Sequence, residues 1–279
     1  MTLFEAYKQS LKSLKNPDVE EINIRILLSE INQLKTMSDF YLRKDEEIQD
    51  LPRYQSFFER YLAGEPVQYI LGKTTFVGLE ILVDKRVLIP RQESEEVVDF
   101  AIKKSHEIFG NKKISILDVC CGSGAMGIAL AKHLNVEHSY FSDASKDAID
   151  VCSSNLKANN VLGQTFVGDA LSPTQNTGIK IDLLISNPPY ILENEPVDKA
   201  VLKYEPHIAL FSDDKFSVYE KIISNLNSVK RSELLAVFEI GINSKKPLED
   251  MIKKYHPLYE YGFIKDINGK ERILYIYLK

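Results

Sequence analysis

The sequence predicts an α/β fold in which a small helical domain precedes a doubly wound, mostly parallel β-sheet. From about residue 113 onwards, short apolar runs rich in β-branched residues alternate with helical patterns, as in parallel sheets covered by helices. Before about residue 72 the apolar residues recur only with helical spacing. Between residues 74 and 90 the period shortens to that of β-strands, and this change separates the two regions.

The first region has two sets of apolar residues that recur at steps of three and four, the spacing of one helix face. The sets are Ile24, Leu27, Leu28, Ile31 and Leu34, and Phe57, Phe58, Tyr61 and Leu62. The second helix should end at Gly64, with Pro66 just beyond it. Asn16-Pro17-Asp18 and Asp50-Leu51-Pro52 are expected to be connections. Residues 1–73 are therefore predicted to form a helical bundle, plausible as a lid or a partner-binding module.

The middle region is predicted to be a β-hairpin over residues 74–90. Its strands would be residues 76–83 and 86–89, with a turn at Asp84-Lys85. A helix should open at Arg91, because the acidic residues that follow suit the positive end of a helix dipole.

Residues 91–279 are predicted to form the sheet domain. Strands are expected at residues 114–119, 138–143, 164–169, 179–185 and 233–239, and helices at residues 125–131 and 148–159. A final hairpin, residues 261–266 and 271–277, should turn at Asn268-Gly269.

The composition is that of an ordinary globular protein, with 44% apolar and 27% charged residues. The net charge of -5 argues against direct binding of duplex DNA, because such surfaces are usually strongly basic. No apolar run reaches the roughly 18–20 residues of a membrane span, and no signal-peptide pattern follows Met1. The three cysteines and five histidines have neither disulfide-framework nor metal-ligand spacing. We expect a monomeric, cytoplasmic protein with no metal site.

Asn187-Pro188-Pro189-Tyr190 is the first candidate site, at the carboxyl end of the fourth strand. The prolines stop the strand and hold Asn187 extended, where ligands bind in open parallel sheets. Asn187 offers an amide oxygen, Pro188 an unused carbonyl and Tyr190 a flat ring, a set that suits a planar NH2 group. The alternative is a simple strand-ending turn, and the tetrapeptide alone does not decide between them.

The second candidate site is the loop from Asp118 to Gly124, between the first strand and its helix. Gly122 and Gly124 allow close approach of a ligand to the backbone. Asp143 ends the next strand, the usual place for a carboxylate that binds a ribose diol. The alternative for Asp143 is to cap the following helix.

The loop favours S-adenosylmethionine over a dinucleotide. Cys120, Gly122 and Ala125 stand at the three glycine places of the G-x-G-x-x-G pattern, which therefore fails. Asp118 would repel a pyrophosphate but not the cationic methionine end of a methyl donor. Gly168-Asp169 ends the third strand, where it could meet the adenine.

With both motifs placed, the sequence resembles the HemK/PrmC family of protein-(glutamine-N5) methyltransferases, which modify class I peptide chain release factors. The resemblance covers nearly the whole chain. It is carried by residues 64–72, Phe76, Gly78, residues 87–91, 118–124, 187–190 and 204–206, Ala209, Leu210 and residues 238–241.

The resemblance implies a Rossmann-like class I methyltransferase domain with a seven-stranded, mostly parallel sheet over residues 91–279. It also implies that the helical domain docks the release factor, and that a methyl group passes from S-adenosylmethionine to the glutamine of a GGQ motif. The implied catalytic residues are Asn187, Pro188 and Tyr190, and Pro189 joins them in binding substrate. The implied cofactor-binding residues are Asp118, Cys120, Cys121, Gly122, Ser123, Gly124, Asp143, Asp169, Ala170 and Asn187.

The chain departs from the family pattern at several positions. Gln92 and Ser94 stand where the family usually has Pro and Thr, and Cys120 stands where Gly is common. Ala170 replaces a Trp found in many members, which removes an aromatic contact for adenine. The rival enzyme is an adenine-N6 nucleic-acid methyltransferase, because adenine presents a similar planar NH2 group. A non-enzymatic binding scaffold is the other alternative.

Overall fold

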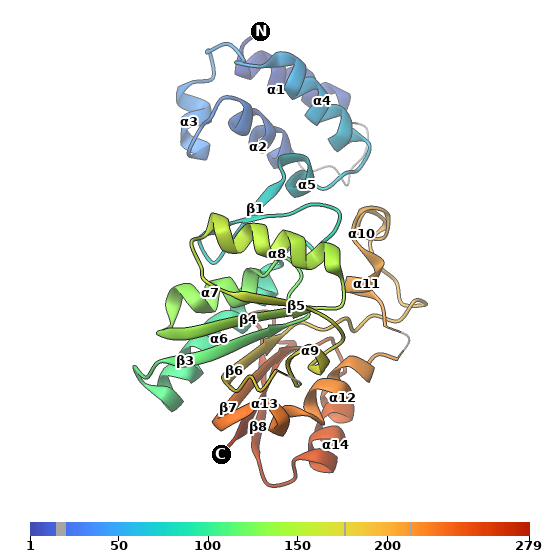
Figure 1. Ribbon diagram of the computed structural model, residues 1–279. Coiled ribbons are helices and arrows are strands. Elements are labelled where there is room, and N and C mark those ends of the chain that lie inside the picture. The colour runs from blue at the N-terminus through green and yellow to red at the C-terminus, as the bar shows by residue number, and fades with distance from the viewer. Residues whose placement is uncertain (15–20, 176, 213) are drawn as a thin grey trace. The chain divides into compact units, whose positions relative to one another are not determined.

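The computed structural model describes residues 1–14, 21–175, 177–212 and 214–279 (Figure 1). The expected connection Asn16-Pro17-Asp18 lies outside these ranges. The chain divides into two compact units. The first comprises Met1–Lys73 and Lys199–Tyr204, and the second Thr74–Asp198 and Glu205–Lys279. Sequence analysis groups residues 199–204 with the sheet domain instead.

The first unit is helical, as its periodicity predicts. Its helices are α1 (Leu3–Ser13), α2 (Glu21–Ile31), α3 (Met37–Leu42), α4 (Leu51–Leu62), α5 (Val67–Leu71) and α10 (Lys199–Tyr204). The predicted face of α2 is buried, whereas in α4 only Tyr61 of the predicted set is buried and Leu62 is exposed. Asp50-Leu51-Pro52 is not a connection. The Asp50 carboxylate accepts from the Arg53 backbone N–H at 3.0 Å and caps α4, which begins at Leu51.

The hairpin turns earlier than expected. Its strands are β1 (Lys73–Phe76) and β2 (Leu79–Leu82), and the turn residues Val77 and Gly78 have φ of +48° and +73°. The predicted pairing of residues 76–83 with 86–89 is therefore wrong. The side chain of Asn155 takes the place of a neighbouring strand at Leu82. It accepts from the Leu82 N–H at 2.6 Å and donates to the Leu82 carbonyl at 2.9 Å.

The second unit contains the predicted seven-stranded sheet, in the order β5-β4-β3-β6-β7-β9-β8. Its strands are β3 (Ile114–Val119), β4 (Val136–Asp143), β5 (Gln164–Val167), β6 (Ile181–Ser186), β7 (Lys230–Glu239), β8 (Glu260–Lys265) and β9 (Glu271–Leu278). β9 alone runs opposite to the other six strands, so the sheet is mostly parallel. Strand order reverses between β3 and β6, which places a binding crevice at their carboxyl ends.

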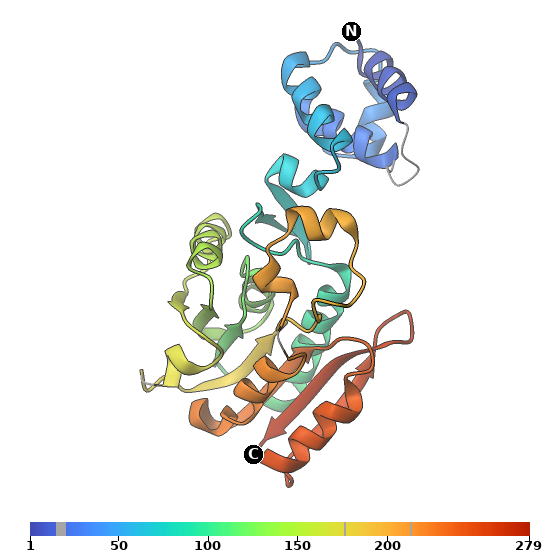
Figure 2. The ribbon, with the colours of Figure 1, turned by 90° about the vertical axis from the view of Figure 1, so that its right-hand side faces the viewer.

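Helices cover both faces of the sheet, with α6, α7 and α8 on one face and α12, α13 and α14 on the other (Figure 1 and Figure 2). Their bounds are α6 Gln92–Phe109, α7 Ala125–His133, α8 Lys146–Ala158, α9 Ser172–Gln175, α11 His207–Leu210, α12 Ser217–Ile223, α13 Leu226–Val229 and α14 Lys245–Tyr255. β3 and β6 are buried along their whole length, as expected for central strands. Within the ranges described, no helix is long and apolar enough to cross a bilayer.

Candidate active site

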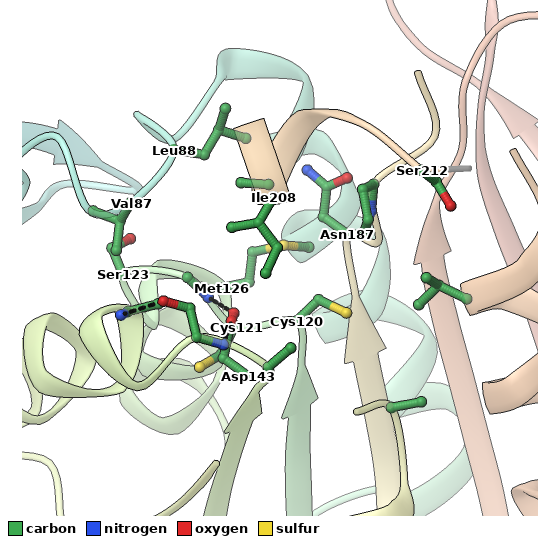
Figure 3. Close-up of a pocket in the computed structure, with 18 of the residues that line it drawn as sticks. Val87, Leu88, Cys120, Cys121, Ser123, Met126, Asp143, Asn187, Ile208 and Ser212 are labelled. Atoms are coloured by element: carbon green, nitrogen blue, oxygen red, sulfur yellow. Dashed lines mark hydrogen bonds between the residues drawn. The ribbon is translucent and has the colours of Figure 1, made fainter. Parts of the chain in front are cut away.

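A cavity of about 380 Å³ lies at the carboxyl ends of β3 to β6 (Figure 3). Its size is typical of a small-molecule site. One part of its wall comes from the carboxyl end of β4 and from the loops and helix starts that follow β3, β4, β5 and β6: Cys120, Cys121, Gly122, Ser123, Ala125, Met126, Asp143, Ala144, Ser145, Ala148, Gly168, Asp169, Ala170, Asn187 and Pro189. The other part comes from flanking segments: Phe76, Arg86, Val87, Leu88, Pro90, Ser94, Ile208, Ala209, Phe211, Ser212, Ser217, Val218 and Lys221.

The loop between β3 and α7 curves tightly because three of its residues have left-handed backbones. These are Cys120, Gly122 and Gly124, with φ of +58°, +53° and +80°. A Cβ atom on Gly124 would lie 2.7 Å from the sulfur of Cys152, so only glycine fits there. Gly124 itself is not among the lining residues. Burial raises the pKa of the Cys120 thiol and so keeps it protonated. Cys120 therefore lines the cavity as a neutral side chain and does not act as a nucleophile.

Asp143 connects this loop to the end of β4. Its Oδ2 accepts from the Gly122 N–H at 2.9 Å and its Oδ1 from the Ser145 N–H at 2.8 Å. Helix α8 is capped by Ser145, whose hydroxyl accepts from the Ala148 N–H at 3.2 Å. Asp143 is therefore not the helix cap. Asp143 lines the cavity, and each of its oxygens can accept one further hydrogen bond, although burial raises the pKa of the carboxyl group.

Asp118 does not have the surroundings expected of a ligand contact. Only 1% of its surface is exposed, and its Oδ2 accepts from the Gly127 N–H at 2.8 Å. It is not among the lining residues, and burial raises its pKa to about 7. Asp118 is therefore a buried residue beside α7, and its expected contact with the methionine end stays a prediction. Its carboxyl group holds α7 against β3, with Gly127 leaving room for it.

The residues that follow β5, the third strand of the seven-stranded sheet, also line the cavity. Asp169 lines the cavity and forms an exposed ion pair with Lys221 of α12. Ala170 also lines it, and its φ of +50° is unusual for a residue other than glycine. Phe211, from the flanking part of the wall, is an aromatic residue that lines the same cavity. Sequence analysis did not identify it, and it could take the place of the aromatic contact that Ala170 lacks.

The Asn187-Pro188-Pro189-Tyr190 motif begins one residue after β6. The Ser186 hydroxyl donates to the Val119 carbonyl at 2.7 Å and ties the end of β6 to that of β3. Asn187 and Pro189 line the cavity, and Figure 3 shows the Asn187 amide across it from Val87. Pro188 is buried, and neither Pro188 nor Tyr190 is among the lining residues.

Tyr190 is half-buried and its ring packs against the backbone of Gly241. A Cβ atom on Gly241 would lie 2.7 Å from Cδ2 of Tyr190, so a larger residue there would displace the ring. Burial raises the pKa of Tyr190 to about 12, so its hydroxyl stays neutral.

A buried carboxylate, Glu239, lies beside this motif at the end of β7. Ser186 pairs with Phe238, so Glu239 is one residue beyond the last registered pair. Its Oε2 accepts from the Ser94 hydroxyl at 2.5 Å, and burial raises its pKa. The family resemblance includes residues 238–241, but nothing in the sequence marks Glu239 as a functional residue.

The cavity thus brings together nine of the predicted cofactor or substrate residues. They are Cys120, Cys121, Gly122, Ser123, Asp143, Asp169, Ala170, Asn187 and Pro189. The residues missed by sequence analysis are mainly apolar, such as Val87, Met126 and Ile208. In a sequence such residues cannot be told from core residues. The described residues contain no group of three or more His, Cys, Asp or Glu that could hold a metal ion.

Two family models match the chain. The PrmC N-terminal domain matches residues 5–72, and the methyltransferase small domain matches residues 94–203.

Curated relatives match over most of their length. A release factor glutamine methyltransferase of Bacillus subtilis is 34% identical, over 98% of this chain and 96% of its own. One of Staphylococcus aureus is 35% identical, over 86% of each chain.

Solved structures share the fold at low identity. The T. thermophilus 16S rRNA N2 G1207 methyltransferase, in complex with AdoMet and guanosine, has a TM-score of 0.54 at 13% identity, covering 74% of this chain and 50% of its own. The hMettl16 catalytic domain has a TM-score of 0.53 at 14% identity, covering 77% and 91%.

Proposed function

The chain belongs to the release factor glutamine methyltransferase family, and we propose on this premise that it methylates a glutamine side chain of class I peptide chain release factors. The methyl group would come from S-adenosylmethionine and go to the amide nitrogen, N5, of the glutamine in a GGQ motif. The observation that carries the proposal is that Asn187 and Asp143 line one cavity. Binding groups for a nucleoside and for a carboxamide are therefore close together.

The cavity residues suit S-adenosylmethionine, which when bound supplies an electrophilic methyl group on a sulfonium. Asp143 would hold the ribose diol through the lone pairs that its two backbone hydrogen bonds leave free. The loop of Cys120, Cys121, Gly122 and Ser123 would bracket the methionine end. Asp169 and Ala170 would border the adenine, with Phe211 as its aromatic neighbour.

The main difficulty of the reaction is that an amide nitrogen is a poor nucleophile, because its lone pair is delocalised into the carbonyl. Asn187 Oδ1 and the Pro188 carbonyl would accept the two amide hydrogens and turn the lone pair towards the methyl group. Such hydrogen bonds each contribute about 0.5–1.5 kcal/mol net. Correct positioning is worth much more, roughly 7–11 kcal/mol, so orientation is the main contribution of this site.

Tyr190 and Pro189 would complete the substrate side. The neutral Tyr190 ring, fixed against Gly241, would cover the planar amide. Positive charge grows on the nitrogen during transfer, and its proton can leave afterwards, so no general base is required beforehand. We also propose that the enzyme acts as a monomer in the cytoplasm, where its three free thiols would stay reduced.

The decisive experiment is incubation of the protein and labelled S-adenosylmethionine with three substrates. These are a class I release factor, the same factor with the GGQ glutamine replaced by alanine, and adenine-containing DNA. We expect label only in the intact factor. Label in the DNA would favour the adenine-N6 alternative, and no label in any sample would refute the proposal.

A further inference from the structure

Two segments far apart in the sequence form part of the cavity wall outside the sheet. Val87, Leu88 and Pro90 come from the stretch between the hairpin and α6. Ile208, Ala209 and Phe211 come from around the short helix α11. Neither segment belongs to the seven-stranded sheet, so strand pairing in that sheet does not fix their separation.

The far end of the second segment is fastened to the chain that follows β6. Ile191, just beyond the Asn187 motif, donates its N–H to the Leu210 carbonyl at 3.2 Å. The Ser212 N–H donates to the Ile191 carbonyl at 3.0 Å. These bonds position residues 210–212 but leave the start of the segment to other interactions.

Glu205 joins the start of this segment to the first one. Its Oε2 accepts from the Ile89 N–H at 3.2 Å, across 116 positions of sequence. Its Oε1 accepts from Nη2 of Arg91 at 2.5 Å. The Glu205 side chain is 1% exposed, whereas that of Arg91 is 38% exposed. One buried carboxylate therefore satisfies two donors that flank Pro90.

We propose that Glu205 is a positioning residue for the methyl donor. It holds the two outer wall segments at the separation that S-adenosylmethionine needs. It touches neither the donor nor the substrate itself. This inference rests on the proposed function, because it assigns that same cavity to the donor. It also gives one physical reason for two motifs, residues 87–91 and 204–206, that sequence analysis noted without a role.

The removal of this carboxylate should widen the cavity. A charge-assisted hydrogen bond is roughly twice as strong as a neutral one, and removing one partner of a buried pair leaves the other partner unsatisfied. Without Glu205, the Ile89 N–H and the Arg91 guanidinium must find water. The segments can then move apart, and the donor must bring them together again, so that its affinity falls.

The test compares wild type with E205Q, R91M and R91K. Glutamine keeps the shape of Glu205 but offers one acceptor oxygen for two donors. We expect E205Q and R91M to weaken S-adenosylmethionine binding about tenfold or more in calorimetry. R91K keeps the positive charge and should stay within about threefold of wild type. At saturating donor, kcat should change by less than about threefold in all three variants.

Glu65 provides the matched control. It forms an ion pair with Arg60 at the same distance of 2.5 Å, but in the helical unit. E65Q should leave donor affinity unchanged. Hydrogen exchange on the donor-free proteins gives a second measurement, and E205Q should exchange faster than wild type and E65Q at residues 86–91 and 206–212.

The outcomes distinguish this inference from the proposed function. If E205Q is folded by thermal unfolding and binds the donor as wild type does, Glu205 has no positioning role. Equal weakening in E205Q and E65Q would also overturn the inference, since the effect would then be general destabilisation. If wild type itself fails to bind S-adenosylmethionine, it is the proposed function that fails.

Discussion

The hydroxyl of Ser94 donates a 2.5 Å hydrogen bond to the carboxylate of Glu239, and both residues are buried although 145 positions separate them. Ser94 lines the cavity near the start of α6, whereas Glu239 ends β7. The bond therefore joins one wall of the cavity to the sheet beside the Asn187 motif.

Replacement of this serine tests the bond directly. S94A removes the hydroxyl that donates to Glu239 Oε2, and loss of a donor to a buried polar group costs about 1–3 kcal/mol. We expect the free energy of unfolding to fall by that amount in urea titrations. S94T keeps the hydroxyl and should retain most of the stability. If both variants lose it equally, packing rather than the hydrogen bond is responsible.

Asn187 is expected to contribute more to methyl transfer than to cofactor binding. N187A should abolish methyl transfer to the release factor, because the amide hydrogens lose one of their two acceptors. The calorimetric affinity for S-adenosylmethionine should stay within about twofold of wild type. Substantial transfer by N187A would remove the residue from the mechanism.

Asp143 and Ser145 should separate cofactor binding from stability. D143A removes the proposed ribose acceptor and should weaken S-adenosylmethionine binding at least tenfold, about 1.4 kcal/mol. S145A removes the α8 cap and should cost about 1 kcal/mol of stability. Calorimetry and thermal unfolding of both variants check this division. If D143A binds S-adenosylmethionine as wild type does, the role of Asp143 is limited to its hydrogen bonds to the Gly122 and Ser145 N–H groups.

Cys120 stores backbone strain in the loop after β3. Its φ of +58° lies in the left-handed region, where a residue other than glycine costs of the order of 1–2 kcal/mol. C120G should therefore raise the free energy of unfolding, partly offset by the greater freedom of glycine in the unfolded chain. The melting temperature measures the net gain. A clear loss of stability would mean that side-chain packing of Cys120 outweighs the strain.

Asp118 should make stability depend on pH. Burial raises its pKa from 3.8 to about 7 in the folded state, so the folded protein binds its proton more tightly than the unfolded chain does. The contribution of Asp118 to stability therefore falls as pH rises from about 4 to about 7. D118N cannot ionise, so its stability relative to wild type should increase over this range and then level off. Urea titrations at several pH values test this, and a constant difference would contradict it.

The strands and the glycine loop could be predicted because they are encoded locally. A buried parallel strand such as residues 114–119 is a continuous apolar run, and Gly122 and Gly124 mark the turn that follows it. The order of the chain then places Asp143 and Asn187 at the same edge of the sheet. The strand order of the sheet is therefore enough to explain why both residues line the same cavity.

The hairpin register and the burial of Asp118 could not be predicted, because distant residues decide them. Both Val77-Gly78 and Asp84-Lys85 can form turns, and Asn155 favours the first by bonding Leu82 from 73 positions away. Asp118 is removed from the cavity by its bond to Gly127 in α7. The outer wall was missed for another reason, since Val87 and Phe211 have no polar group to mark them.

Asn155 also has a consequence for the free edge of the hairpin. Its amide donates to the carbonyl of Leu82 and accepts from its N–H, as a neighbouring strand would, and it donates as well to the Ser123 carbonyl. An aspartate at position 155 could not donate these hydrogen bonds, and a leucine could neither donate nor accept them. An open strand edge invites pairing with other chains and aggregation. At Leu82 a single side chain from a helix closes that edge.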